Sequence, residues 1–161
     1  MRALFVIAHP DDEVLGCGGV LARHANCGDE IRVAFLAEGV TARFNRDELD
    51  SPEVRELSRR RNQNAIRALR LLGISEEAVF VAERFCCRLD EVPQIELVKS
   101  IEQHIRQFKP ERIYTHAAFD TNVDHRITHR AVIAAARPVW PFAIEILTFE
   151  VLSSTEWNPT N

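Results

Sequence analysis

The chain has no long hydrophobic run. Its 161 residues are 46% hydrophobic, but no segment approaches the ~20 consecutive apolar residues that a membrane-spanning helix needs. The sequence passes from Met1 and Arg2 directly into a short apolar segment, and this start does not resemble a secretory signal peptide. These absences exclude a membrane span and predict a cytoplasmic protein.

An excess of positive charge is also missing. The chain has 20 Lys and Arg residues against 24 Asp and Glu residues, which gives a formal net charge of -4. The arginines are scattered among acidic residues and do not form a basic patch. Because nucleic-acid binding depends on clustered cations that neutralise phosphates, the composition argues against a nucleic-acid partner and favours a small-molecule ligand.

The four cysteines do not form a C-x-x-C pair; they are Cys17, Cys27, Cys86 and Cys87. Two adjacent cysteines are poorly suited to an ordinary disulfide or to a shared zinc site, so we interpret them as free thiols. Cys17 lies closest to the acidic segment discussed below. It is a candidate nucleophile, but its position between two glycines favours a packing role.

The glycines do not form a phosphate-binding motif. Gly16, Gly18 and Gly19 fail the G-x-G-x-x-G pattern, and no G-K-[ST] sequence follows them. Close approach between a helix and a sheet explains glycines at these positions. Nucleotide binding is therefore the weakest of the functional alternatives.

Apolar strand patterns and amphipathic helix patterns alternate along the chain. The expected strands are 3–8, 30–37, 78–82, 111–115 and 144–152, and the expected helices are 13–25, 51–72, 92–108 and 125–137. Alternating units of this kind form a parallel sheet with helices on both faces. We expect one domain over residues 1–161, a three-layer α/β sandwich with a mostly parallel sheet of about five strands in the order 3-2-1-4-5.

Histidine and acidic residues gather where two of these strands end. The segment His9 to Glu13 follows the first strand, and the segment His116 to His125 follows the fourth. In the expected order these strands are neighbours at the point where the strand order reverses. Ligands of open α/β sheets bind at that point, so both segments are expected to contribute to one site.

His9, Asp12 and His125 are the candidate metal ligands. Two imidazoles and one carboxylate leave a fourth position open, which is typical of a catalytic zinc site. Asp11 then remains as a general base toward a metal-bound water. The alternative is that the acidic residues only cap the following helix, but capping does not account for His-Pro followed by three acids. Zn²⁺ is the expected cofactor, and other divalent metals remain open.

Three further groups near these strand ends are candidates for supporting roles. Asp124 is interpreted as the N-cap of the fourth helix, as the residue that orients His125 or another imidazole, or as both. His116, at the end of the fourth strand, is a candidate substrate contact, although a histidine there is more often structural. Arg61 falls on the apolar face of the second helix, which predicts an anionic or polar partner near the sheet edge.

The motifs Ala8-His9-Pro10-Asp11-Asp12-Glu13, Gly18-Gly19 and Asn122-Val123-Asp124-His125-Arg126 resemble the PIG-L (LmbE-like) family of zinc-dependent de-N-acetylases. The likeness extends to Leu152-Ser153-Ser154-Thr155-Glu156-Trp157. It implies a Rossmann-like sheet, zinc on His9, Asp12 and His125, and Asp11 as general base. The implied substrates carry acetamido groups, usually on N-acetylglucosamine derivatives.

The chain departs from the family pattern at three places. In the second helix, many members have an acidic residue about where this chain has Asn64, so Arg61 lacks that neighbour. Many members have His-Pro-Asp-His where this chain has Asn122-Val123-Asp124-His125. An asparagine amide can donate a hydrogen bond to an oxyanion, but it cannot deliver a proton. Family members also continue beyond the Ser-Thr-Glu-Trp segment, so we expect a domain that lacks part of the C-terminal region.

The sequence therefore predicts a hydrolase that removes an N-acetyl group from a sugar-like small molecule. Asp11, Asn122 and Asp124 are the candidate catalytic residues. Arg43, in the long loop after the second strand, is either a contact for substrate hydroxyl or phosphate groups or a solvated loop charge. Arg61 and His116 are further candidate contacts. The alternative is a metal-containing binding protein without turnover. Assembly into a homo-oligomer is left open.

Overall fold

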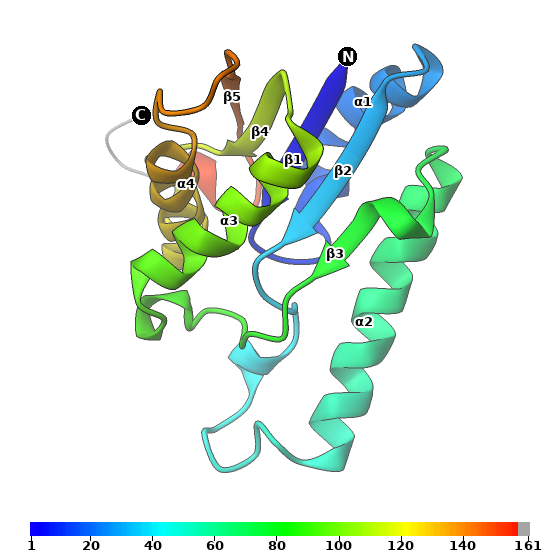
Figure 1. Cartoon of the computed structure of the whole chain (residues 1–161). Helices are drawn as coiled ribbons and strands as arrows, with labels where there is room; N and C mark the ends of the chain where they lie inside the picture. The colour runs from blue at the N-terminus through cyan, green and yellow to red at the C-terminus, as the bar shows by residue number, and fades with distance from the viewer. Residues whose placement is uncertain (158–161) are drawn as a thin grey trace.

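The structure, a computed structural model, describes residues 1–157 of the chain. A sheet of parallel strands in the order β3-β2-β1-β4-β5 runs through its centre (Figure 1). The strands are β1 (Arg2–Ile7), β2 (Glu30–Phe35), β3 (Val79–Val81), β4 (Arg112–His116) and β5 (Glu145–Phe149). The predicted strand order is confirmed, and the strand ends differ from the expected ones by at most three residues.

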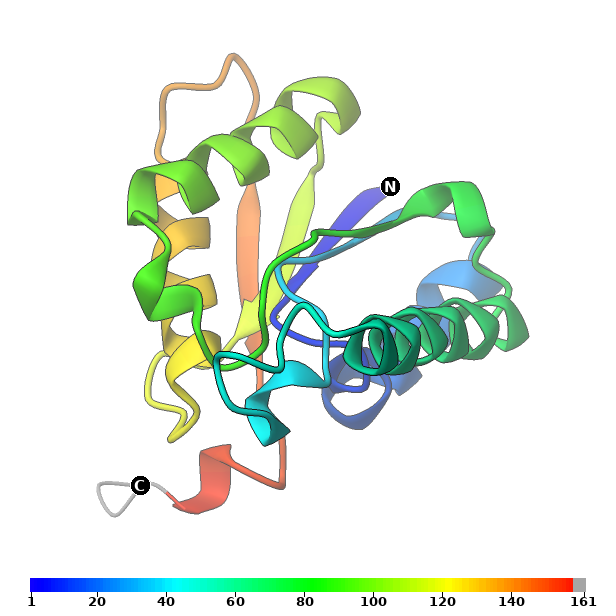
Figure 2. The same cartoon turned by 90° about the horizontal axis from the view of Figure 1, so that it is seen from below.

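Helices cover both faces of the sheet, as predicted for a three-layer sandwich. They are α1 (Asp12–Asn26), α2 (Pro52–Leu71), α3 (Gln94–Phe108) and α4 (Val123–Ala135). One buried cluster joins the sheet to α1 and α2, for example through Leu21 and Leu69. The other joins the opposite face to α3 and α4, for example through Ile101 and Val132. Figures 1 and 2 show the two pairs of helices on opposite sides.

β1 belongs to both buried clusters, because its side chains alternate between the two faces. Phe5 and Ile7 point into the cluster with α1 and α2, whereas Leu4 and Val6 point into the cluster with α3 and α4. All four side chains are completely buried. A central strand of a parallel sheet is covered on both faces, and this explains its nearly continuous apolar sequence.

The start of α2 follows the sequence prediction, but the start of α4 does not. Ser51 Oγ accepts a hydrogen bond from the Val54 amide, and Pro52 occupies the first turn of α2. At α4 the N-cap is Asn122, whose Oδ1 accepts from the Asp124 amide at 2.9 Å. The N-cap role predicted for Asp124 is therefore wrong, because Asp124 already lies inside the first turn of the helix.

The glycines of α1 differ in what surrounds them. A Cβ atom at Gly16 would overlap the ring of Phe149 and lie 3.1 Å from the carbonyl oxygen of Glu150. This is the close approach that the sequence predicts. At Gly19 a Cβ atom would meet nothing within 4 Å, so the explanation by close packing does not extend to Gly19.

The loops that follow the strands gather at one end of the molecule. β1 and β4 are paired in parallel, so the segments that follow them leave the sheet side by side. The Ala8 amide donates to His116 Nε2 at 2.9 Å, which joins the two strand ends directly. Figure 2 views this end, where the loops after β2, β3 and β4 approach the segment 150–157.

Among residues 1–157, no helix has both the length and the apolar composition that crossing a membrane requires. The longest of them, α2, carries many charged side chains along its 20 residues.

Candidate metal centre

The fold brings His9, Asp12 and His125 together at the adjacent ends of β1 and β4. His9 follows β1, Asp12 begins α1, and His125 lies in the first turn of α4. Asp12 Oδ2 is 3.1 Å from His125 Nε2 and 3.4 Å from His9 Nδ1. Each of the three residues offers one ligand atom, and these atoms all lie within 4.8 Å of one another.

This set of side chains fits a divalent metal ion of the zinc class. All three residues are at most 5% exposed. His125 Nε2 is buried and makes no hydrogen bond, although Asp12 Oδ2 is close to it. A buried polar atom without a hydrogen-bond partner is costly, and a metal ion would satisfy it. Two imidazoles and one carboxylate are also a ligand set found in catalytic zinc sites.

Each candidate imidazole ligand is held through its other ring nitrogen by a carboxylate. His125 Nδ1 lies 3.0 Å from Asp120 Oδ2, and His9 Nε2 lies 2.8 Å from Asp124 Oδ2. Carboxylates in this position orient a metal-binding imidazole and select its tautomer. Asp124 thus holds His9 and not His125, and Asp120, which the sequence did not single out, is the partner of His125.

Asp120 is itself fixed by neighbouring groups. Its Oδ2 accepts hydrogen bonds from Ser154 Oγ at 2.9 Å and from Thr155 Oγ1 at 2.6 Å, and its Oδ1 accepts from the Asn122 amide at 2.8 Å. The Ser-Thr segment after β5 therefore supports the orientation of His125. In the sequence, only the resemblance of this segment to family members indicated that it has a role.

Asp11 occupies the N-cap position of α1, but its side chain does not cap the helix. Its φ angle of 130° is rare for a residue other than glycine. The Asp11 amide donates to Glu13 Oε2 at 2.7 Å, and its carboxylate Oδ2 pairs with Arg61. Arg61 also donates from Nε to the Pro10 carbonyl oxygen at 2.9 Å. These contacts hold a strained turn that directs Asp11 into the pocket, so helix capping does not explain the role of Asp11.

The surroundings of the two aspartates shift their pKa values in opposite directions. Burial, followed by the charge of Asp12, raises the pKa of Asp11, and the Arg61 guanidinium opposes this shift. Burial also opposes ionisation of Asp12, but its contacts with His125 and His9 hold the pKa of Asp12 well below its usual range. Asp12 is therefore suited to bind a cation and Asp11 to accept a proton.

A pocket of about 270 Å³ opens beside these residues. Several side chains singled out by the sequence line it: His9, Asp11, Asp12, Arg43, Arg61, Asn122 and His125. Cys86, Cys87 and Ser154 also line it, although the sequence alone did not assign them to a site. Residues from six separate segments of the chain thus meet at this pocket.

His116 does not line the pocket. Its side chain is completely buried, its ring stacks on that of His125 with 3.9 Å between centroids, and its Nε2 accepts the Ala8 amide. Burial lowers the pKa of His116 to about 3. His116 therefore packs against His125 in the interior. The predicted contact of His116 with substrate is not compatible with this buried position.

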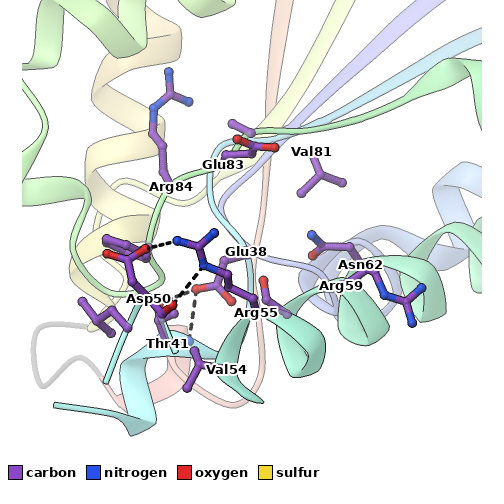
Figure 3. A pocket seen from close by; sticks show the side chains of 14 residues that line it. Glu38, Thr41, Asp50, Val54, Arg55, Arg59, Asn62, Val81, Glu83 and Arg84 are labelled. Carbon is purple, nitrogen blue, oxygen red and sulfur yellow. Dashed lines mark hydrogen bonds and ion pairs between the residues drawn. The ribbon is translucent and has the colours of Figure 1, made fainter. Parts of the chain in front are cut away.

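A larger cavity, of about 530 Å³, lies on the other side of the Thr41–Arg43 turn (Figure 3). Arg55 and Asp50 form an ion pair at its edge, with 3.0 Å between Nη2 and Oδ1. Glu38 lines this cavity, and its carboxylate accepts the amides of Val40 and Thr41. None of the candidate site residues lines the larger cavity, so we place the candidate site in the smaller pocket.

Comparison with known proteins identifies relatives of this chain. Residues 4–136 match the family PIG-L, described as GlcNAc-PI de-N-acetylase. The 1D-myo-inositol 2-acetamido-2-deoxy-alpha-D-glucopyranoside deacetylase of Kineococcus radiotolerans is 33% identical over 75 residues, which are 47% of this chain and 21% of that protein. The 2'-N-acetylparomamine deacetylase of Streptomyces fradiae is 25% identical over 155 residues, 89% of this chain and 55% of that protein.

A solved structure shares the fold of this chain. The crystal structure of the conserved protein TT1542 from Thermus thermophilus superimposes with a TM-score of 0.70 at 26% identity. The match covers 92% of this chain and 65% of that one. The chain thus corresponds to about half of the second curated relative and to less of the first. Because the family match covers most of its length, the chain belongs to the PIG-L family.

Proposed function

We propose that this protein is a metal-dependent hydrolase that removes an N-acetyl group from an amino sugar or one of its glycosides. The main observation is the open His9, Asp12 and His125 set with Asp11 beside it in the same pocket. The fold alone does not specify a reaction, because one fold hosts many chemistries. Family membership and the names of the two curated relatives support deacetylation.

His9, Asp12 and His125 would hold the metal ion, with Zn²⁺ as the expected cofactor. A divalent ion in such a site polarises a carbonyl group and lowers the pKa of water. The protein residues set the geometry: Asp120 and Asp124 fix the two imidazoles, and the buried Asp12 carboxylate stays ionised. The carboxylates beside the imidazoles also make these rings more basic ligands.

Asp11 is the proposed general base. Arg61 engages Asp11 Oδ2, so Oδ1 is the oxygen that accepts a proton from the attacking water. The same carboxyl group then returns the proton to the nitrogen of the leaving amine, which restores the carboxylate. In this assignment Arg61 positions Asp11, and this replaces the direct substrate contact expected from the sequence.

Asn122 is proposed to stabilise the oxyanion of the tetrahedral intermediate. Its Oδ1 caps α4, so its side-chain NH₂ group is the part that remains to donate a hydrogen bond. Asp124 acts differently, because its carboxylate contacts His9 and backbone amides and does not line the pocket. Asp124 is therefore a positioning residue in this proposal.

The pocket accommodates the reacting end of a small polar substrate. Its lining is rich in charged and hydroxyl groups, which suit a sugar better than an apolar ligand. Arg43, on the turn after β2, is proposed to hold a hydroxyl or phosphate group of the substrate. One curated relative is named for a 2-acetamido-2-deoxyglucopyranoside and the other for 2'-N-acetylparomamine. We extend this class of N-acetylated substrates to the present chain.

The test is acetate release by the zinc-loaded protein. The substrates are N-acetylglucosamine, its glycoside with inositol, and an N-acetylated aminoglycoside. We expect turnover of at least one of the glycosides. Zinc binding together with substrate binding but without acetate from any of the three would contradict the proposal. Such a result would support the alternative of a metal-containing binding protein without turnover.

Replacing Asp120 with alanine is expected to weaken zinc binding by about 10- to 100-fold, because His125 loses the carboxylate that orients it. The affinity is measured by competition with a chromogenic chelator. The matched control is Asp29→Ala, since Asp29 contacts His24 Nδ1 at 2.7 Å outside the candidate metal centre. Equal zinc affinity in the Asp120 variant and the wild type would show that this carboxylate does not support the metal.

A further inference from the structure

Cys86 and Cys87 lie beside His9 in the pocket. All four cysteines are free, and the Sγ atoms of this adjacent pair are 3.8 Å apart. His9, Cys86 and Cys87 each offer one ligand atom, and these atoms all lie within 4.8 Å of one another. Cys86 is buried, whereas Cys87 is exposed. Two adjacent cysteines do not by themselves indicate a metal site, but the fold places the imidazole of His9 close to them.

The backbone of this cysteine pair is held by two buried carboxylates from other segments. Glu38 Oε1 accepts the Cys86 amide at 2.9 Å, and Asp124 Oδ2 accepts the Cys87 amide at 2.7 Å. Cys87 adopts a φ angle of 56°, in the left-handed region that residues other than glycine rarely occupy. A strained conformation persists where its surroundings fix it, so the backbone that carries the two thiols is held in place by the fold.

We propose that His9, Cys86 and Cys87 form a second metal site, which takes a thiophilic divalent ion of the zinc and cadmium class. Two thiolates and one imidazole are a known zinc-binding set, and thiolates favour soft ions. Each thiol that ligates the ion releases its proton to solvent, so binding through both releases two protons. The exposure of Cys87 allows an ion to reach the site from solvent.

The second site shares His9 with the candidate metal centre. Asp124 engages His9 Nε2 at 2.8 Å, so Nδ1 is the ring nitrogen that remains for a metal. A single nitrogen ligates one ion, and therefore the two sites cannot both use His9 at the same time. An ion bound to the cysteines and His9 would leave the candidate metal centre with only Asp12 and His125. Binding of a thiophilic ion to the cysteine pair would therefore displace the metal ion from that centre.

Cadmium is the probe, because a cadmium–thiolate bond gives a charge-transfer absorption band in the ultraviolet. The metal-free full chain, kept reduced with a phosphine, is titrated with Cd²⁺. We expect the band to saturate at one ion per chain and to be lost in the double variant Cys86→Ser/Cys87→Ser. Cys27→Ser is the matched control, because Cys27 is an exposed free cysteine outside the cluster, and it should keep the band.

Absence of the band in the wild-type protein, or its persistence in the double variant, would overturn the site. Loss of the fold is tested separately, by the circular dichroism spectrum and the zinc content of the double variant. We expect the spectrum and the zinc content to remain at wild-type values, so that loss of the band reports loss of the cysteine site alone. The His125→Ala variant should retain the band, because its cysteines and His9 are intact. This readout does not use deacetylation, so it distinguishes failure of the cysteine site from failure of the proposed function.

The shared use of His9 has its own measurement. Adding Cd²⁺ to the zinc-loaded wild type is expected to release zinc into solution as the charge-transfer band grows, whereas the double variant should retain its zinc at the same low cadmium excess. Binding of cadmium to the cysteines with full retention of zinc would overturn the competition for His9.

Discussion

Replacing Asp11 with asparagine is expected to lower the rate of acetate release by a factor of about 10² to 10⁴ while the zinc content stays at the wild-type level. The amide keeps the size of the side chain and can still contact Arg61, but it cannot take a proton from water. Asp11 lies beside the candidate metal ligands without being one of them. The measurement is steady-state acetate release, with zinc determined by elemental analysis.

Asp50→Asn is the matched control for this experiment. Asp50 also pairs with an arginine, Arg55, but it lines the neighbouring larger cavity (Figure 3). The rate of acetate release should therefore remain at the wild-type value in this variant. A wild-type rate of acetate release in the Asp11 variant would exclude Asp11 as the general base.

Replacing His125 with alanine is expected to remove stoichiometric zinc, from one ion per chain to none, and with it all acetate release. The substitution deletes the buried Nε2 atom, which makes no hydrogen bond. It also removes the imidazole that contacts both Asp12 and Asp120. Elemental analysis after dialysis against excess zinc measures the occupancy.

His129→Ala is a suitable control because His129 lies one turn further along α4. His129 Nδ1 contacts the His116 carbonyl oxygen at 2.9 Å and does not belong to the candidate ligand set. This variant should retain zinc, and thermal unfolding followed by circular dichroism verifies that both variants fold. Full zinc retention in His125→Ala would remove His125 from the ligand set.

The strand order and the layers were predictable because they depend on patterns along the chain. A strand buried on both faces, such as β1, is apolar at successive positions, and parallel strands need helical crossovers between them. The convergence of His9 and His125 followed from the same reasoning, since the ends of neighbouring parallel strands meet. Helix starts were less predictable, as shown by Asn122, which caps α4 in place of Asp124.

The pairing of side chains within the site was not predictable from these patterns. Asp124 and Asp120 both precede His125 closely, yet Asp124 points to His9 and Asp120 to His125. His116 ends a strand that leads to the pocket, but its ring is buried behind His125. Cys86 and Cys87 lie close to His9, and carboxylates of two distant segments hold their amides there.

The sequence by itself determined the family, the order of the strands and the types of side chain present where the strands end. Periodicity and motif spacing carry this information, because they reflect which residues must be buried and which turns the backbone makes. Only the tertiary structure decided which carboxylate holds which imidazole, which residues reach the pocket, and that two cysteines lie close to His9. These outcomes depend on the directions of side chains from separate segments, which are set by packing and hydrogen bonding across the fold.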